Sequence, residues 1–255
     1  MKRIIVVFLV LILVTGSMNA LAEDGGSYIN VGDYGSEVIA LHQKLADLGY
    51  FSLRPESPWS AKSESALKAV QYVLGLDETG IVADKMQYDS IMGLDENLPQ
   101  FAIKRIQGID EYLDYIREHE DFTVFIAVQD EASNKLKDST KEKLRALGLT
   151  TDWNQDRYRK AYIAVVEGDH VIEEIAAAEK TGAGLTTSGT MDGTSYRISS
   201  SGWENEGGSN CSIVLNDKEW AKNKRGFNFV VVAGERVVDS VAFDTCSEAD
   251  PVGQR

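Results

Sequence analysis

The first third of the chain places apolar residues at helical spacing. Apolar side chains recur at three- and four-residue intervals across residues 36–48 and 63–74, and a glycine follows each stretch where a helix would end. A shorter helix is indicated at residues 88–92. This pattern predicts a compact three-helix domain over residues 27–95, small but able to enclose a core of its own.

The pattern changes after a polar, proline-containing stretch at residues 96–108, which we expect to be a linker. Residues 122–128 and 161–166 are continuously apolar, branched or aromatic, which is typical of buried strands. Helical spacing returns at residues 109–119 and 139–147. The middle of the chain therefore predicts strands and helices in alternation.

Short strand-like segments dominate the last part of the chain. They are residues 171–172, 196–199, 212–215, 227–233 and 236–243. Gly234-Glu235 joins the last two as a tight hairpin, and the Gly-, Ser- and Thr-rich residues 181–195 are expected to form a flexible loop. Together with two helices, these strands predict an α+β, mainly β and sandwich-like domain over residues 109–255.

The N-terminus has the pattern of a secretory signal peptide. Lys2 and Arg3 precede an apolar run at residues 4–14, and small residues at 20–22 provide a cleavage site. The alternative is a membrane anchor, but this run is too short to span a bilayer, which needs about 20 apolar residues. We therefore expect residues 1–22 to be removed and the mature protein to be secreted or wall-associated, not embedded in a membrane.

The charge balance and the cysteine and histidine counts exclude several classes of function. The chain has 26 basic and 40 acidic residues, a net charge of −14, which argues against binding to nucleic acid or to anionic lipid. Two cysteines and three histidines cannot supply a four-cysteine zinc site. Phosphate-loop, serine-hydrolase and zinc-peptidase motifs are also absent from the sequence. We therefore expect no metal and no cofactor.

Export would place Cys211 and Cys246 outside a reducing cytosol. One disulfide between them is expected in that environment. Two buried free thiols are the alternative, because the sequence alone does not fix the geometry that a disulfide requires.

Several short motifs between residues 32 and 82 are shared with a known family. They are Gly32-Asp33-Tyr34-Gly35-Ser36-Glu37-Val38, Leu41-His42-Gln43-Lys44-Leu45, Leu48-Gly49-Tyr50-Phe51 and Thr79-Gly80-Ile81-Val82. This segment resembles the peptidoglycan-binding domain of the first type. The resemblance implies a three-helix bundle of the kind appended to bacterial wall enzymes and wall-associated proteins, with peptidoglycan or another glycan as partner.

The chain departs from the family pattern near the loops that would hold a ligand. Residues 56–60 replace the usual Asp-Gly-x-Phe-Gly, and Ala83 stands where a glycine is usual. Tyr50, Phe51 and Trp59 are the aromatic residues of this region that could stack on a sugar ring. The alternative is that Tyr50 and Phe51 belong to the core and that Trp59 partly covers it.

The remaining domain resembles a second family, with its two halves in exchanged order. Residues 196–203, 216–231 and 237–245 are similar to the first half of the interleukin-like EMT inducer domain, also called the GG domain, and residues 125–133, 144–148 and 158–162 to its second half. We interpret the order as a circular permutation in which residues 181–195 join the old ends. The family includes secreted cytokine-like proteins and the stem domain of a glycosyltransferase.

This second resemblance implies structural roles for residues that could otherwise be catalytic. Asp130 and Glu131 follow a strand and invite an acid–base interpretation. The resemblance implies instead that these carboxylates accept backbone N–H bonds or pair with arginines. The residues expected to be structural are Asp130, Glu131, Arg159, Gly226 and Asp244.

Two features of this domain fit ligand binding. The hydroxyls of Ser199 and Ser201 and the aromatic faces of Trp203 and Trp220 suit a glycan, with turn chemistry and core packing as the alternative. Four basic residues between positions 218 and 225, the last of them Arg225, could dock an anionic glycan or an acidic protein. The alternative for this cluster is a solvated loop.

The two resemblances together predict a secreted, non-catalytic, two-domain protein that binds cell wall or carbohydrate. The first alternative is an extracellular protein–protein interaction or signalling module, with an envelope protein as its partner. The second alternative is a wall hydrolase, which would need a carboxylate pair drawn from Asp130, Glu131 and Asp244.

Overall fold

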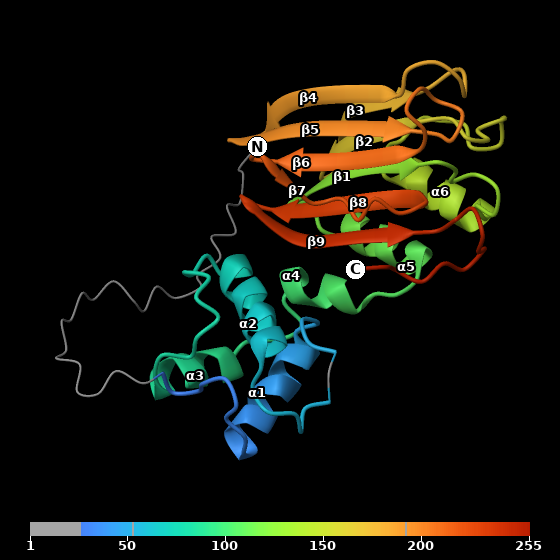
Figure 1. Ribbon diagram of the computed structural model, residues 1–255. Coiled ribbons are helices and arrows are strands. Elements are labelled where there is room, and N and C mark those ends of the chain that lie inside the picture. Colours follow the sequence, from blue (N-terminus) through green and yellow to red (C-terminus); the bar gives the residue numbers. More distant parts are fainter. Residues whose placement is uncertain (1–26, 53, 192) are drawn as a thin grey trace.

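The computed structural model describes residues 27–52, 54–191 and 193–255 (Figure 1). The predicted signal peptide lies outside the described residues. The described chain forms a helical unit (residues 27–98) and a sheet unit (residues 103–255), so the predicted α+β class is confirmed. No helix in the described ranges is long and apolar enough to cross a membrane.

Three helices build the helical unit close to the predicted positions. They are α1 (Ser36–Asp47), α2 (Ala61–Val73) and α3 (Lys85–Met92). Ser60 begins α2 with a capping box, because its hydroxyl accepts the Ser63 N–H while the Ser63 hydroxyl accepts the Ser60 N–H. The fully buried members of the core include Leu41, Leu45, Leu67 and Val70.

A short connector joins the two units and is packed into both. It consists of α4 (Pro99–Ala102) and a 3-10 turn, η1 (Ile103–Arg105). Phe101 is fully buried in the core of the helical unit, whereas Ile103 is fully buried in the core of the sheet unit. Burial on both sides therefore fixes the two units against each other.

The described part of the sheet unit contains nine strands, which pair almost entirely antiparallel. Their bounds are β1 (Phe122–Gln129), β2 (Tyr162–Glu167), β3 (His170–Ala176), β4 (Leu185–Met191), β5 (Thr194–Ser201), β6 (Asn210–Leu215), β7 (Lys218–Glu219), β8 (Gly226–Ala233) and β9 (Arg236–Phe243). β1 pairs with β2 on one edge and with β8 on the other, and β3 and β9 extend these edges. The group β4–β7 joins β1 through one parallel pair, Gln129 with Ser201.

The strands around β1 are buried on both faces. Phe125 of β1 packs in a cluster with residues of β5 and β6, whereas Val124 and Ile126 pack in a cluster with residues of α5 (Ile109–Arg117) and α6 (Asp138–Ala146). Successive side chains of a strand point to opposite faces, so a strand covered on both faces is apolar throughout. This arrangement explains the continuous apolar run in the sequence and gives the unit its layers of helices and strands (Figure 1).

The expectation of a flexible loop over residues 181–195 is wrong for about half of the segment. Leu185–Met191 forms β4, which pairs antiparallel with β5 along its whole length. Gly189 lies against the Tyr196 side chain, where an added Cβ would come within 2.5 Å of the hydroxyl oxygen. A larger residue at this position would force the Tyr196 side chain to move, so the glycine marks a close approach within a strand.

The expected disulfide is not present, because Cys211 and Cys246 are both free thiols. Cys211 lies in β6, in the apolar cluster between the strand layers, while Cys246 follows β9 in the turn that begins at Asp244. Burial raises the pKa of Cys211 to about 12. The buried thiol is therefore protonated and acts as a small apolar side chain.

Candidate functional site

Two of the three aromatic residues that could stack on a sugar pack against His42 instead. The ring centroids of Phe51 and Trp59 lie 4.3 and 5.2 Å from that of His42, with interplanar angles of 9° and 8°. His42 is fully buried, and its Nε2 atom lies 2.8 Å from the Ser63 hydroxyl oxygen. Trp59 is only 2% exposed, so it belongs to the core and offers no open face to a ligand.

The third residue, Tyr50, lies at a groove between the two units. Two cavities of about 440 and 290 Å³ share Tyr72 of α2 and Trp220, which follows β7. We call the two cavities together the interdomain groove and the smaller one, which Tyr50 lines, its inner cavity. One wall comes from α2 and the other from residues 218–222 and β9, and Figure 1 shows α2 beside β9.

Tyr72 and Trp220 contact each other across the groove. Their ring centroids are 5.6 Å apart, and the Tyr72 hydroxyl accepts a hydrogen bond from the Val237 N–H at 3.3 Å. The Lys218 ammonium lies 4.1 Å from the centroid of the Trp220 ring, and the Arg236 guanidinium lies 5.3 Å from that of Tyr72. The wall of the groove is therefore both aromatic and positively charged.

A buried ion cluster lies at the inner cavity. The Asp239 carboxylate is fully buried and accepts hydrogen bonds from Lys104 Nζ at 3.2 Å, Arg255 Nε at 3.1 Å and the Tyr112 hydroxyl at 3.1 Å. These contacts tie β9 to the connector and to α5. Burial lowers the pKa of Lys104, and the charge of Asp239 opposes that shift.

The inner cavity carries an excess of positive charge in an acidic protein. Five basic and two acidic residues line it, and one of the two acids, Asp239, is already paired. No described carboxylate lies within ion-pair distance of Lys68, Lys218 or Lys222, whereas eight other described lysines are paired. Desolvation lowers the pKa of Lys222, and the charge of Asp239 opposes this shift only in part.

The predicted basic cluster at residues 218–225 is divided by the fold. Lys218 and Lys222 line the groove, whereas Arg225 pairs with Asp244. Arg225 Nη2 lies 2.7 Å from Asp244 Oδ2, and Asp244 Oδ1 also accepts the N–H groups of Cys246 and Ser247 at 3.1 Å. Burial alone would raise the pKa of Asp244, but these hydrogen bonds hold it below its usual value. Arg225 is therefore engaged within the protein.

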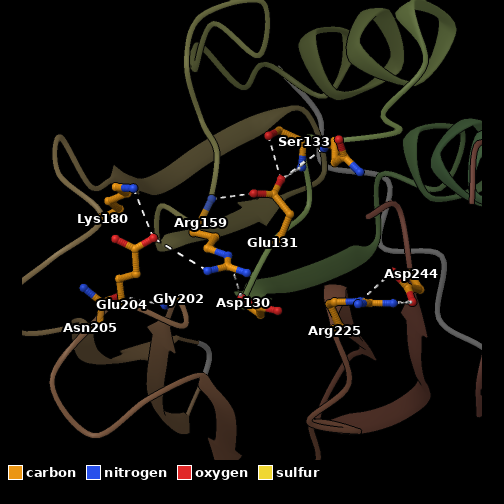
Figure 2. A network of polar contacts seen from close by, with 11 residues as sticks. Asp130, Glu131, Ser133, Arg159, Lys180, Gly202, Glu204, Asn205, Arg225 and Asp244 are labelled. Carbon is orange, nitrogen blue, oxygen red and sulfur yellow. Dashed lines mark hydrogen bonds and ion pairs between the residues drawn. The ribbon is translucent and has the colours of Figure 1, made fainter. Parts of the chain in front are cut away.

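Glu131 is enclosed by hydrogen-bond donors at the end of β1. It is 1% exposed and accepts bonds from the N–H and hydroxyl of Ser133 and from the N–H groups of Asn134 and Arg159 (Figure 2). The Asn134 bond is 3.1 Å long and the Ser133 hydroxyl bond 2.6 Å. A buried carboxylate held by four donors orders the surrounding loops and offers no free face to a substrate.

An ion-pair network continues from Glu131 across the loops in Figure 2. Arg159 lies 3.9 Å from Asp130 and 3.6 Å from Glu204, and Lys180 lies 3.0 Å from Glu204. Gly202 packs against this network, because an added Cβ would lie 2.0 Å from the Arg159 carbonyl oxygen. These contacts give Asp130 and Arg159 a role in holding loops together.

Gly226 permits another close approach between backbones. Its φ angle is +95°, a region that favours glycine, and an added Cβ would lie 2.1 Å from the Phe243 carbonyl oxygen. Gly226 begins β8 next to Phe227, the partner of Phe243 in β9, so a larger residue here would separate β8 from the end of β9. This geometry is structural.

The predicted glycan set in the sheet unit does not assemble into one site. Trp220 lines the groove, whereas Trp203 is 63% exposed in a turn and, like Ser199 and Ser201, lines neither cavity. Ser201 anchors a loop, because its hydroxyl donates to the Gly208 carbonyl at 2.7 Å. Trp220 and Tyr50 are therefore the candidates that the fold brings together.

Sequence reasoning missed most of the groove. Lys68 and Tyr72 are separated from Lys218 and Trp220 by more than half of the chain, Lys104 is separated from them by somewhat less, and no local motif connects these residues. The sequence signals for the groove were Tyr50, Trp220 and the basic cluster at residues 218–225. Tyr72 is a further large aromatic residue, outside the apolar stripe of its helix.

The comparison with known families gives one match. Residues 34–85 match the family described as "Putative peptidoglycan binding domain", and this segment contains α1 and α2 and ends at the start of α3. No curated protein and no solved structure matches the chain. The match supports binding to the cell wall through the helical unit, while the resemblance of the sheet unit to the GG domain has no support from it.

Proposed function

We propose that the protein is an exported, non-catalytic component of the bacterial cell envelope that binds peptidoglycan, or a glycan attached to it. The observation that carries this proposal is the family match over residues 34–85, which spans most of the helical unit. The sheet unit is held against this binding module by the connector and by the contact between Tyr72 and Trp220. The two units therefore meet a wall polymer as one body.

The environment of the candidate carboxylates supports a non-catalytic role. A general acid needs a raised pKa and access to substrate. Glu131 is buried under four hydrogen bonds, and the pKa of Asp244 is lowered by its bonds with Arg225 and the following backbone. Neither carboxyl group therefore has the properties of the general acid of a glycoside hydrolase.

The sheet unit, in this proposal, is a circularly permuted GG-like module that binds carbohydrate. Residues 109–176 and 185–255 contribute to the same core, as two halves of one domain would. The segment proposed to join the old ends, residues 181–195, follows β3 and contains β4. The hydroxyl of Thr187 in β4 donates to Glu173 of β3 at 2.8 Å, so the joined strands lie close together.

Co-sedimentation with insoluble peptidoglycan tests this function. The full chain is expected to leave the supernatant as the amount of wall increases, without releasing soluble sugars or peptides from it. Protein that stays in the supernatant at every wall concentration would overturn wall binding. Time-dependent release of fragments that disappears in Asp244→Asn would overturn the non-catalytic role. Capture of an envelope protein after complete digestion of the glycan would favour a protein-binding module instead.

A further inference from the structure

The inner cavity of the interdomain groove is a binding site for which the family match gives no precedent. It includes residues of the sheet unit that lie outside the matched segment, namely Lys218, Trp220 and Lys222. We propose that this cavity binds an anionic saccharide, with a sugar ring against Trp220 and Tyr72 and its carboxylate or phosphate among the free lysines. This inference rests on the proposed wall-binding function and names the ligand chemistry.

The charge of the cavity selects an anion. In a chain with 40 acidic and 26 basic residues, the lining of the inner cavity is unusual because it has five basic residues and two acidic ones. Lys68, Lys218 and Lys222 of this lining have no carboxylate within ion-pair distance among the described residues. Desolvation makes the charged form of Lys222 less favourable. A bound carboxylate or phosphate would restore the lost counter-charge and gain charge-assisted hydrogen bonds.

The two cavities differ in charge, and this difference places the anion. The larger outer cavity is lined by two acidic residues, Glu78 and Glu235, and two basic ones, so its charges balance. The inner cavity retains its positive excess even with Glu78 on its edge. The anionic group therefore belongs in the inner cavity, and a neutral part of the ligand can extend into the outer one.

Aromatic residues add selectivity for a ligand with an apolar face. Trp220 and Tyr72 line both cavities, and their rings are tilted by 36° at a centroid distance of 5.6 Å. Aromatic side chains offer large apolar faces together with a polar edge, which suits a sugar ring better than it suits a bare ion. The combined volume is also within the usual range for small-ligand sites, roughly 300–1,000 Å³.

The test uses the full chain, two groove variants and a matched control. Lys218→Gln/Lys222→Gln removes two charges from the groove, and Trp220→Phe reduces the aromatic surface. Lys62→Gln/Lys135→Gln removes two charges from exposed lysines that have no ion-pair partner among the described residues and do not line the groove. All four proteins are compared for thermal unfolding before binding is measured, so a loss of fold is recognised.

Binding is measured with two soluble probes and two wall preparations. The probes are a muramyl peptide, which supplies carboxylates, and a glycerol-phosphate oligomer, which supplies phosphates. Intact walls are compared with walls from which phosphate polymers have been extracted. The double groove variant is expected to lose about tenfold in affinity for one probe class, while the control double stays within twofold of the wild type. The responding probe identifies the source of the anion.

The outcomes separate this inference from the proposed function. If the wild type sediments with walls and the groove variants bind walls and both probes equally well, the groove assignment is wrong and wall binding stands. If the wild type binds a soluble probe in the groove but sediments with no wall, the proposed function is wrong and the site stands. Equal binding of sodium sulfate and the saccharide probes would show an adventitious ion site only and would overturn the inference.

Discussion

Asp239→Asn is the substitution that most directly tests how the two units are held together. The Asp239 carboxylate is fully buried on β9 and accepts hydrogen bonds from Lys104, Arg255 and Tyr112. Asparagine has nearly the same shape but no charge, so the substitution leaves two cations without their counter-charge. The connector, β9 and α5 would lose their shared anchor.

The expected cost is about 3 kcal/mol of unfolding free energy. Removing one partner of a buried ion pair costs roughly 3–5 kcal/mol, because the remaining charge is left uncompensated. The lower end of this range applies here, because the Lys104 and Arg255 side chains are 16% and 19% exposed and solvent still screens their charges. For a chain of this size, that cost corresponds to a fall in Tm of about 6–12 °C.

The loss of unfolding free energy in Asp239→Asn is also expected to depend on pH in a defined direction. Burial already lowers the pKa of Lys104, and Asp239 is the charge that opposes this shift. In Asp239→Asn the folded protein therefore holds its Lys104 proton more weakly than the unfolded chain does. The free energy of unfolding of Asp239→Asn then rises with pH as that proton is released. The difference from the wild type should therefore shrink as the pH approaches 10.

Urea unfolding followed by tryptophan fluorescence measures this effect. Trp59 reports on the helical unit and Trp153 on the sheet unit, because both indoles are almost fully buried. Asp89→Asn is the control, since it breaks the exposed Lys85–Asp89 pair and should leave the free energy of unfolding close to that of the wild type. An Asp239→Asn protein within about 1 kcal/mol of the wild type would show that Asp239 does not hold the two units together.

Three further predictions concern the sheet unit. The pKa of Asp244 is lower in the folded protein, so its carboxylate stabilises the fold above the unfolded pKa of about 3.9, and this stabilisation is lost as the pH falls through the folded pKa. The difference in free energy of unfolding between the wild type and Asp244→Asn should therefore vanish as acid is added. Gly202→Ala should destabilise by more than 2 kcal/mol in urea, because its Cβ would lie 2.0 Å from a carbonyl oxygen, whereas Gly108→Ala, with open space around it, should not. Cys246 should react with a thiol reagent at pH 8 well before Cys211, whose burial raises its pKa to about 12; equal rates would contradict this.

The arrangement of helices and strands followed from periodicity in the sequence. The stretch at residues 63–74 predicts a helix, and α2 spans Ala61–Val73 with Ser60 as its cap. The continuous apolar run at 122–128 predicts a buried strand, and β1 occupies Phe122–Gln129. These segments are readable because one face or both faces of each element are buried, so the core selects apolar residues at a fixed spacing.

β4 was missed because its pairing depends on small side chains. Leu185–Met191 is made largely of threonine, serine and glycine, which carry little apolar pattern. Gly189 leaves room for the Tyr196 ring of the neighbouring strand, a contact that becomes visible only when the two strands are paired. Composition alone therefore cannot distinguish this edge strand from a loop.

The groove could not be predicted because its parts are distant in sequence. Asp239 lies in an otherwise largely apolar strand, and no residue near it in the sequence indicates that Lys104 and Arg255 are its ion-pair partners. The basic cluster at 218–225 was visible, but its division into groove residues and the Arg225–Asp244 pair depends on the turn before β8. Trp59 was visible as an aromatic residue, and its burial against His42 follows only from the packed helices.

Wall binding by the intact protein is tested by a binding isotherm of the full chain on insoluble peptidoglycan. We expect saturable binding that is displaced by soluble muramyl peptides and weakened as salt is raised, since the free lysines of the groove contribute to it. Retention that rises linearly without saturation, or that no soluble wall fragment displaces, would contradict specific recognition of the wall.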